Sequence, residues 1–264
     1  MTDLIFFGLA EDGVMSSRAM RPDPFLYPDV EAAGGDLVAA LRETGKQMGV
    51  PMAGLGESYP PEGRSSHFAA VVEAECGDVR IELRQERREV TVMIRMPLLG
   101  IGGYGATGSL EVAVEVAHAW RSGMPLAEMA AEWEFLTVTP EALAHDQGKA
   151  VEFEWASIQR LPANLIDQDL VAAAFRSPEL RSLFPIVTHG SLQFRRRTIS
   201  GPGSDVPSIF PMTGGRWRVI CLWDPKIPKR IAETTEEAVG IVVAGLPEGC
   251  GAAVEVIRAA RRGA

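Results

Sequence analysis

The fold is decided by the stretch from residue 67 to residue 96, which reads HFAAVVEAECGDVRIELRQERREVTVMIRM. Apolar and polar residues alternate along it, most clearly in DVRIELR at 78–84. This period of two places the apolar side chains on one face of a β-strand. Short polar interruptions at 76–78 and 87–88 divide the stretch into three strands. It therefore predicts an antiparallel meander with one solvated face.

Helical patterns surround this meander. One short helix is predicted at about 36–48, and the glycine-rich run GIGGYGATG at 100–108, expected to be a tight loop or strand edge, leads into the others. Further helices are predicted at 109–123, 126–136, 140–161 (continuous, with Gly148 a weak point), 166–177 and 234–247, and strands at 191–198 and 215–223. The expected class is α+β: an antiparallel sheet lobe, a helical middle and a smaller C-terminal sheet with a covering helix. We divide the chain into lobes 1–135 and 136–264, with one continuous domain as the alternative.

Composition indicates the kind of partner. The 264 residues carry a net charge of −9, which argues against nucleic acid as the main ligand. Between Arg176 and Arg230, however, there are ten Lys or Arg and three Asp or Glu, out of 26 and 35 in the whole chain. This asymmetry suits an anionic ligand or partner. Three widely spaced cysteines, no signal peptide and no membrane-spanning apolar stretch predict a cytoplasmic protein that does not contact a membrane.

Four residues are candidates for acid–base chemistry. His189 lies in a predicted turn before a strand, and loops on rigid scaffolds often carry function, although a histidine that holds the turn is the alternative. On a continuous helix, Glu152 would lie two turns below His145, so a carboxylate could assist an imidazole; a solvated stripe with Lys149 is the alternative. Tyr104, in the glycine-rich run, is a possible second acid.

Arginine and aromatic side chains are candidates for substrate binding. Arg195 and Arg197 share a face of the strand at 191–198 and would grip a carboxylate, enolate or phosphate if that strand pairs with the strand at 215–223. A solvated edge strand is the alternative. Apolar walls for a large substrate are expected from the aromatic residues Trp120, Trp155, Phe194 and Trp217.

Metal and cofactor signatures are missing from the sequence. The four histidines show no metal-ligand spacing, and the cysteines form no CxxC pair. The glycine-rich run follows a meander, whereas a dinucleotide fingerprint needs a βαβ context. We therefore predict no metal and no cofactor.

Scattered short motifs run through most of residues 28–255. They comprise residues 105–110, 119–123, Ala144, His145, Gly148, Trp155, 173–174, 178–181, 183–185, 188–190, 192–194, 207–209, Gly215, 237–239 and 246–247. Together they resemble a bacterial family labelled natural product biosynthesis proteins, which has no established general chemistry. The resemblance implies tailoring or cyclisation of a polyketide or peptide.

Two classes of function follow. The first is a cofactor-independent dehydratase or cyclase that acts on a polyketide or polyketide–peptide intermediate, since elimination needs only a base, an acid and an oxyanion stabiliser. The second is a non-catalytic binding, scaffold or immunity protein, whose Arg-rich lobe meets an acidic partner such as a carrier protein. The expected partners are a small biosynthetic intermediate and an acidic protein; a deep pocket with His and Arg favours the enzyme, and a flat Arg face favours the binding protein.

Overall fold

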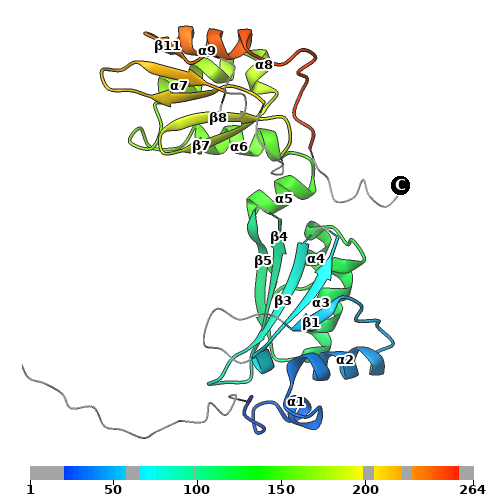
Figure 1. Cartoon of the computed structure of the whole chain (residues 1–264). Coiled ribbons are helices and arrows are strands. Elements are labelled where there is room, and N and C mark those ends of the chain that lie inside the picture. Colours follow the sequence, from blue (N-terminus) through cyan, green and yellow to red (C-terminus); the bar gives the residue numbers. More distant parts are fainter. Residues whose placement is uncertain are drawn as a thin grey trace, which may run out of the picture.

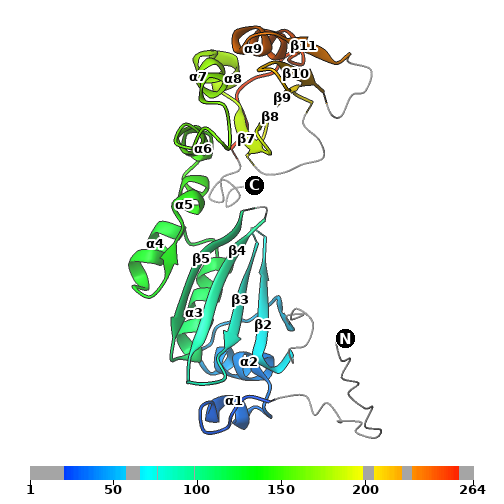
Figure 2. The ribbon, with the colours of Figure 1, turned by 90° about the vertical axis from the view of Figure 1, so that its left-hand side faces the viewer.

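A computed structural model describes residues 21–57, 66–75, 77–97, 99–198, 205–221 and 228–255. Figure 1 shows two lobes, each built on its own antiparallel sheet. Helices from the middle of the chain connect them, as the turned view in Figure 2 shows. The predicted α+β class, with a large N-terminal sheet, a helical middle and a smaller C-terminal sheet carrying a helix, is confirmed.

The first sheet has six strands in sequential order. These strands are β1 (Leu55–Glu57), β2 (Ala69–Ala74), β3 (Gly77–Leu83), β4 (Val90–Met96), β5 (Gly100–Thr107) and β6 (Thr137–Val138). β2 to β4 are the predicted meander, in which Val79 pairs with Val72 and Ile94, all fully or almost fully buried. The period of two in the sequence therefore reports this buried face.

The glycine-rich run forms β5, a strand that pairs with β4 on one side and β6 on the other. A side chain at Gly105 would meet the carbonyl oxygen of Phe135 at 2.3 Å. Glycine is thus required where the segment before β6 crosses close to the strand.

Helices cover one face of this sheet. Helices α2 (Leu37–Gln47) and α3 (Leu110–Arg121) pack on its strands, while α1 (Pro28–Ala32) packs on α2, α4 (Leu126–Glu132) packs beside β6, and a 3-10 turn spans Ser66–Phe68. Ser109 caps α3, because its hydroxyl accepts a hydrogen bond from the Val112 amide at 3.2 Å. Asp36 caps α2 in the same way through the Ala39 amide at 2.8 Å.

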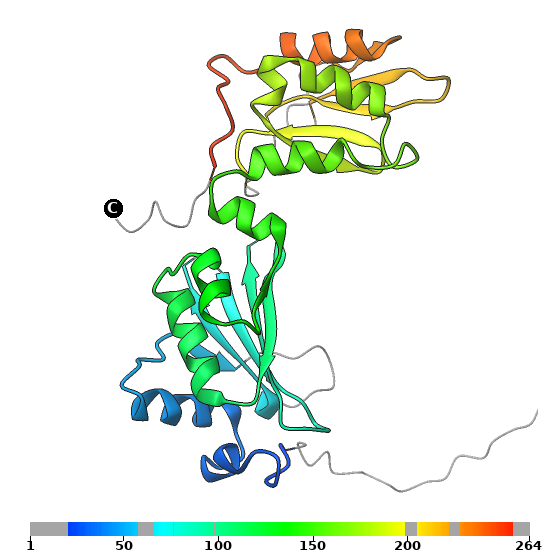
Figure 3. The same ribbon diagram turned by 180° about the vertical axis from the view of Figure 1, so that it is seen from behind.

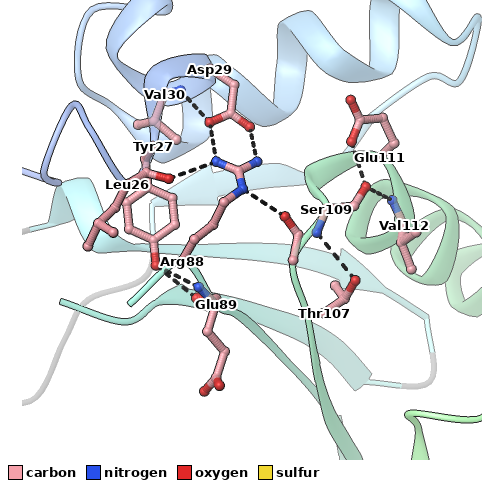
Figure 4. A network of polar contacts seen from close by, with 11 residues as sticks. Leu26, Tyr27, Asp29, Val30, Arg88, Glu89, Thr107, Ser109, Glu111 and Val112 are labelled. Atoms are coloured by element: carbon pink, nitrogen blue, oxygen red, sulfur yellow. Dashed lines mark hydrogen bonds and ion pairs between the residues drawn. The ribbon is translucent and has the colours of Figure 1, made fainter. Parts of the chain in front are cut away.

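A polar network joins α1 to the β3–β4 hairpin (Figure 4). The guanidinium of Arg88 binds Asp29 through two nitrogens at 2.9 and 2.7 Å, and donates to the carbonyl oxygens of Leu26 and Gly108, each at 2.9 Å. The hydrogen bond from Arg88 lowers the pKa of the Asp29 carboxyl. This arginine ties three separate segments together, so its role in the described structure is structural.

The second sheet has five strands in the order β11-β10-β9-β8-β7. They are β7 (Phe184–Thr188), β8 (Ser191–Arg195), β9 (Ser208–Pro211), β10 (Trp217–Ile220) and β11 (Arg230–Ala232). Seen from behind in Figure 3, the helices α6 (Ala150–Ile158), α7 (Gln168–Arg176), α8 (Pro178–Arg181) and α9 (Thr235–Ala244) lie on one face of the lobe. The condition for a continuous arginine band, direct pairing of the two arginine-bearing strands, is not met, because β9 lies between β8 and β10.

The short helix α5 (Pro140–Asp146) connects the lobes (Figure 2). One apolar core includes residues from Tyr27 to Ala142, and the other includes residues from Trp155 to Val242. β6 pairs with the first sheet although it follows residue 135. The division into 1–135 and 136–264 stays a prediction, and the two cores favour a boundary near the end of α5.

No helix in the described ranges combines the length and the apolar character needed to span a bilayer.

Candidate functional site

A groove of about 410 Å³ lies beside α6 in the C-terminal lobe. Residues of α6 line it together with Phe175 at the end of α7, Arg181 at the end of α8 and Glu255 of the C-terminal segment. Figure 3 shows α6 and α7 from the side of the lobe that carries them. A volume of this size is in the range of small-molecule sites. The groove includes two of the predicted site residues, Glu152 and Trp155.

Two aromatic rings form the apolar part of the groove. The ring centroids of Trp155 and Phe175 are 5.3 Å apart at an angle of 60°. The Trp155 indole nitrogen donates to the carbonyl oxygen of Leu183 at 3.1 Å, and the side chain is almost fully buried. Trp155 is therefore fixed by the core and exposes little of its surface to the groove, while Phe175 is half-buried.

The C-terminal segment closes the groove at the start of α6. The Glu255 carboxylate accepts hydrogen bonds from the amides of Ala150 at 3.0 Å and Val151 at 3.3 Å. The N-cap position of α6, Lys149, provides no side-chain cap, so a residue distant in sequence supplies it. Val254 holds the segment in place through a parallel bridge with Arg197.

The charged groups at the groove are of both signs. Arg181 lies over the Phe175 ring, with its guanidinium carbon 5.6 Å from the ring centroid. Arg181, Lys149 and Glu152 are exposed, and within the described ranges none of them makes an ion pair. Glu255 is already engaged by the helix amides. The groove thus offers two available cations and one available carboxylate to a ligand.

The continuous helix that would place Glu152 two turns below His145 does not form. The helix expected to run through 140–161 breaks at Gly148, whose φ is 69°, into α5 and α6. His145 is 5% exposed in the last turn of α5, with its ring 5.9 Å from that of Phe184. Burial lowers the pKa of His145, and the nearby Glu255 partly offsets this. The two residues therefore do not share a helix face, and His145 lies outside the residues that line the groove.

Tyr104 and Trp120 belong to the other lobe. Tyr104 is not in a loop; it lies on β5, pairs with Met93 and Thr137, and is 49% exposed. Trp120 is 1% exposed in the first core. Neither residue lines the groove of the C-terminal lobe.

His189 forms the predicted turn between β7 and β8. Its φ is 49°, the following Gly190 has φ 75°, and the side chain is exposed. Two successive positive φ angles are typical of a two-residue hairpin turn. This geometry favours the structural alternative, because it accounts for the position without a ligand.

The predicted binding residues of the strands lie in different surroundings. Phe194 and Trp217 are buried in the second core. Arg195 is half-buried at the end of β8, and Arg197 is exposed beside Val254. None of the four lines the groove.

Most residues of the groove could not be predicted from the sequence. Phe175, Arg181 and Glu255 were not candidates, because no local pattern links them to α6. Glu154, which does not line the groove, was not among the candidates either: burial raises the pKa of this carboxyl, and the nearby Glu141 adds to the rise. A signal for Glu154 exists in the sequence, since it is an acidic residue inside the apolar run AVEFEWASI.

The described residues form no candidate metal site. Within the described ranges, no three His, Cys, Asp or Glu side chains come together in a way that could hold a metal ion.

The fold and the groove define an α+β protein with a ligand-sized site in its C-terminal lobe. Residues 149–257 match DUF6193, a family of unknown function. The matched range starts at the groove residue Lys149 and ends two residues after Glu255, so it covers the lobe that holds the groove. No curated protein and no solved structure matches the chain. The natural-product label stays a prediction.

Proposed function

We propose that the C-terminal lobe binds a small organic molecule, with an apolar body and an acidic group, in the groove beside α6. The observation that carries this proposal is the stacking of Arg181 over Phe175, next to Trp155. The two rings supply apolar contact area, and the guanidinium supplies a planar donor for a carboxylate or phosphate. Exposed Lys149 adds a second cation at the same groove.

The ligand class follows from this chemistry together with the resemblance. A polyketide or polyketide–peptide acid combines an extended apolar body with a carboxylate. An amine on such a molecule would find Glu152 as its partner. The proposal therefore places a biosynthetic intermediate of this class in the groove.

A groove-filling variant tests the location. Ala156 is exposed on α6 and lines the groove, so Ala156→Trp should occupy it without disturbing the core. The probe is anilinonaphthalene sulfonate, an aromatic anion whose fluorescence rises in an apolar site. We expect the wild-type chain to bind it, Ala156→Trp to weaken binding roughly tenfold or more, and the exposed-arginine control Arg42→Gln to bind normally. Unchanged binding by Ala156→Trp would place the probe elsewhere and contradict the proposal.

A second candidate is cofactor-independent dehydration or cyclisation in the same groove. The observation in its favour is that Glu152 and Lys149, a potential base and a potential acid, line the groove with the aromatic rings. A producer strain without this gene should accumulate an intermediate. The purified chain should convert that intermediate by loss of water or by isomerisation, and Glu152→Gln should slow the conversion roughly a hundredfold. If the intermediate binds to the chain and is not converted, the catalytic candidate is excluded and only the binding function is supported.

A further inference from the structure

The second sheet has one face that the helices leave open. Figures 1 and 3 show α6, α7 and α9 on the opposite face, and within the described ranges no helix lies over this one. Arg218 of β10 pairs with Phe210 of β9 and with Ile231 of β11. The next residue, Val219, is buried in the core, so strand alternation points these three side chains to the open face.

Apolar and basic side chains alternate on this face. Ile231 is 52% exposed, which is high for a large apolar residue on a sheet. Phe210 is half-buried and Arg218 is exposed. Arg216 is half-buried and directly precedes β10, two residues before Arg218. Together, Phe210, Arg216, Arg218 and Ile231 are called the basic face.

The cations of the basic face are available to a partner. In the described part of this lobe, ion pairs join Arg176 to Glu236 and Arg196 to Asp205, and neither Arg216 nor Arg218 takes part in one. The five strands of this sheet contain no Asp or Glu. A positive surface on a chain of net charge −9 has complementary charge to an acidic partner.

We propose that the basic face docks an acidic protein, which presents carboxylates flanked on both sides by apolar side chains. The carboxylates would pair with Arg218 and Arg216 in the middle of the face, while the apolar side chains would cover Phe210 on β9 and Ile231 on β11. Apolar residues on both sides of Arg218 favour a protein over a nucleic acid, because a phosphate backbone offers them no apolar contact. The inference is independent of the groove, which lies on the helical side of the lobe.

The test uses a fluorescent amphipathic helical peptide, with Glu along the middle of one face and Leu on both sides of it, and a Gln-for-Glu version of it. Fluorescence anisotropy with the full chain should detect binding of the Glu peptide, weaker binding of the Gln peptide and a loss of affinity as salt is added. Arg218→Glu should lower the affinity roughly tenfold or more. The matched control is Arg42→Glu, which reverses an exposed arginine of α2.

Two further variants show whether a loss of binding in Arg218→Glu comes from the basic face or from misfolding of that one variant. Arg216→Glu should have the same effect as Arg218→Glu, and Ile231→Asp should weaken binding through loss of the apolar contact and through repulsion. No binding of the Glu peptide, or binding that Arg218→Glu and Arg216→Glu leave unchanged, would overturn the proposal. Tighter binding of a short DNA duplex than of the Glu peptide would also overturn it.

Discussion

The Glu255 carboxylate caps a helix that begins 105 residues earlier, by accepting the amide hydrogen of Ala150 at 3.0 Å. The same carboxylate lines the groove beside α6. The C-terminal segment thus stabilises the start of α6 and forms one end of the candidate site, which links the stability of the lobe to the shape of the groove.

Replacing Glu255 should destabilise the C-terminal lobe. Glu255→Ala removes the acceptor for two amide groups at a helix N-terminus, and loss of such a cap costs about 1 kcal/mol. Urea unfolding measures the change in the free energy of unfolding. Glu248→Ala, which alters an exposed glutamate a few residues earlier, is the control and should be close to neutral. Equal stability of the two variants would show that the cap contributes nothing.

Two glycines of the β5 region should respond differently to a methyl group. A Cβ at Gly105 would lie 2.3 Å from the Phe135 carbonyl oxygen, whereas a Cβ at Gly108 would have no neighbour within 4 Å. Gly105→Ala should therefore lower the free energy of unfolding by about 1–3 kcal/mol, and Gly108→Ala should stay within about 0.5 kcal/mol of wild type. Thermal unfolding of both variants checks this. If Gly105→Ala is as stable as wild type, the Phe135 carbonyl does not lie as close to Gly105 as the structure places it.

The ion pair of Asp29 with Arg88 should make stability depend on pH at the acidic end. Because Arg88 lowers the pKa of Asp29 in the folded chain, its contribution is present above the unfolded pKa of about 4 and is lost as pH falls through the folded value. Asp29→Asn should lower stability at neutral pH and lower it much less at about pH 3. Urea midpoints at both pH values measure this. The control is Glu86→Gln, in the same hairpin and exposed; a pH-independent loss in Asp29→Asn would contradict the account.

Burial of His145 should make stability depend on pH closer to neutrality. Burial lowers its folded pKa, so the unfolded chain takes up the proton first, and stability falls as pH drops below about 6.5 until the folded pKa is reached. His145→Phe keeps an aromatic ring beside Phe184 and should reduce the loss of stability between about pH 7 and pH 5. His189→Asn is the control, since asparagine tolerates the left-handed turn position. An unchanged pH dependence in His145→Phe would show that this imidazole titrates normally.

The sequence predicts the fold better than the site, for physical reasons. The alternation at 78–84 records a buried sheet face, so the meander could be read from it. A glycine inside a helical pattern costs only about 1 kcal/mol, so the break at Gly148 could not be distinguished from a tolerated weak point. β9 has only four residues and ends in Pro211, too short for a clear period. The groove depends on Glu255 meeting α6, and contacts between such distant segments leave no local pattern.

The most direct test of the groove compares a charged probe with its uncharged counterpart. Wild-type chain and Arg181→Gln are each titrated with anilinonaphthalene sulfonate and with anilinonaphthalene, which lacks the sulfonate. We predict that the wild type prefers the anion by roughly tenfold, and that Arg181→Gln loses this preference while still binding the uncharged ring. An anion preference that survives in Arg181→Gln, or an equal loss of affinity for both probes, would contradict the account.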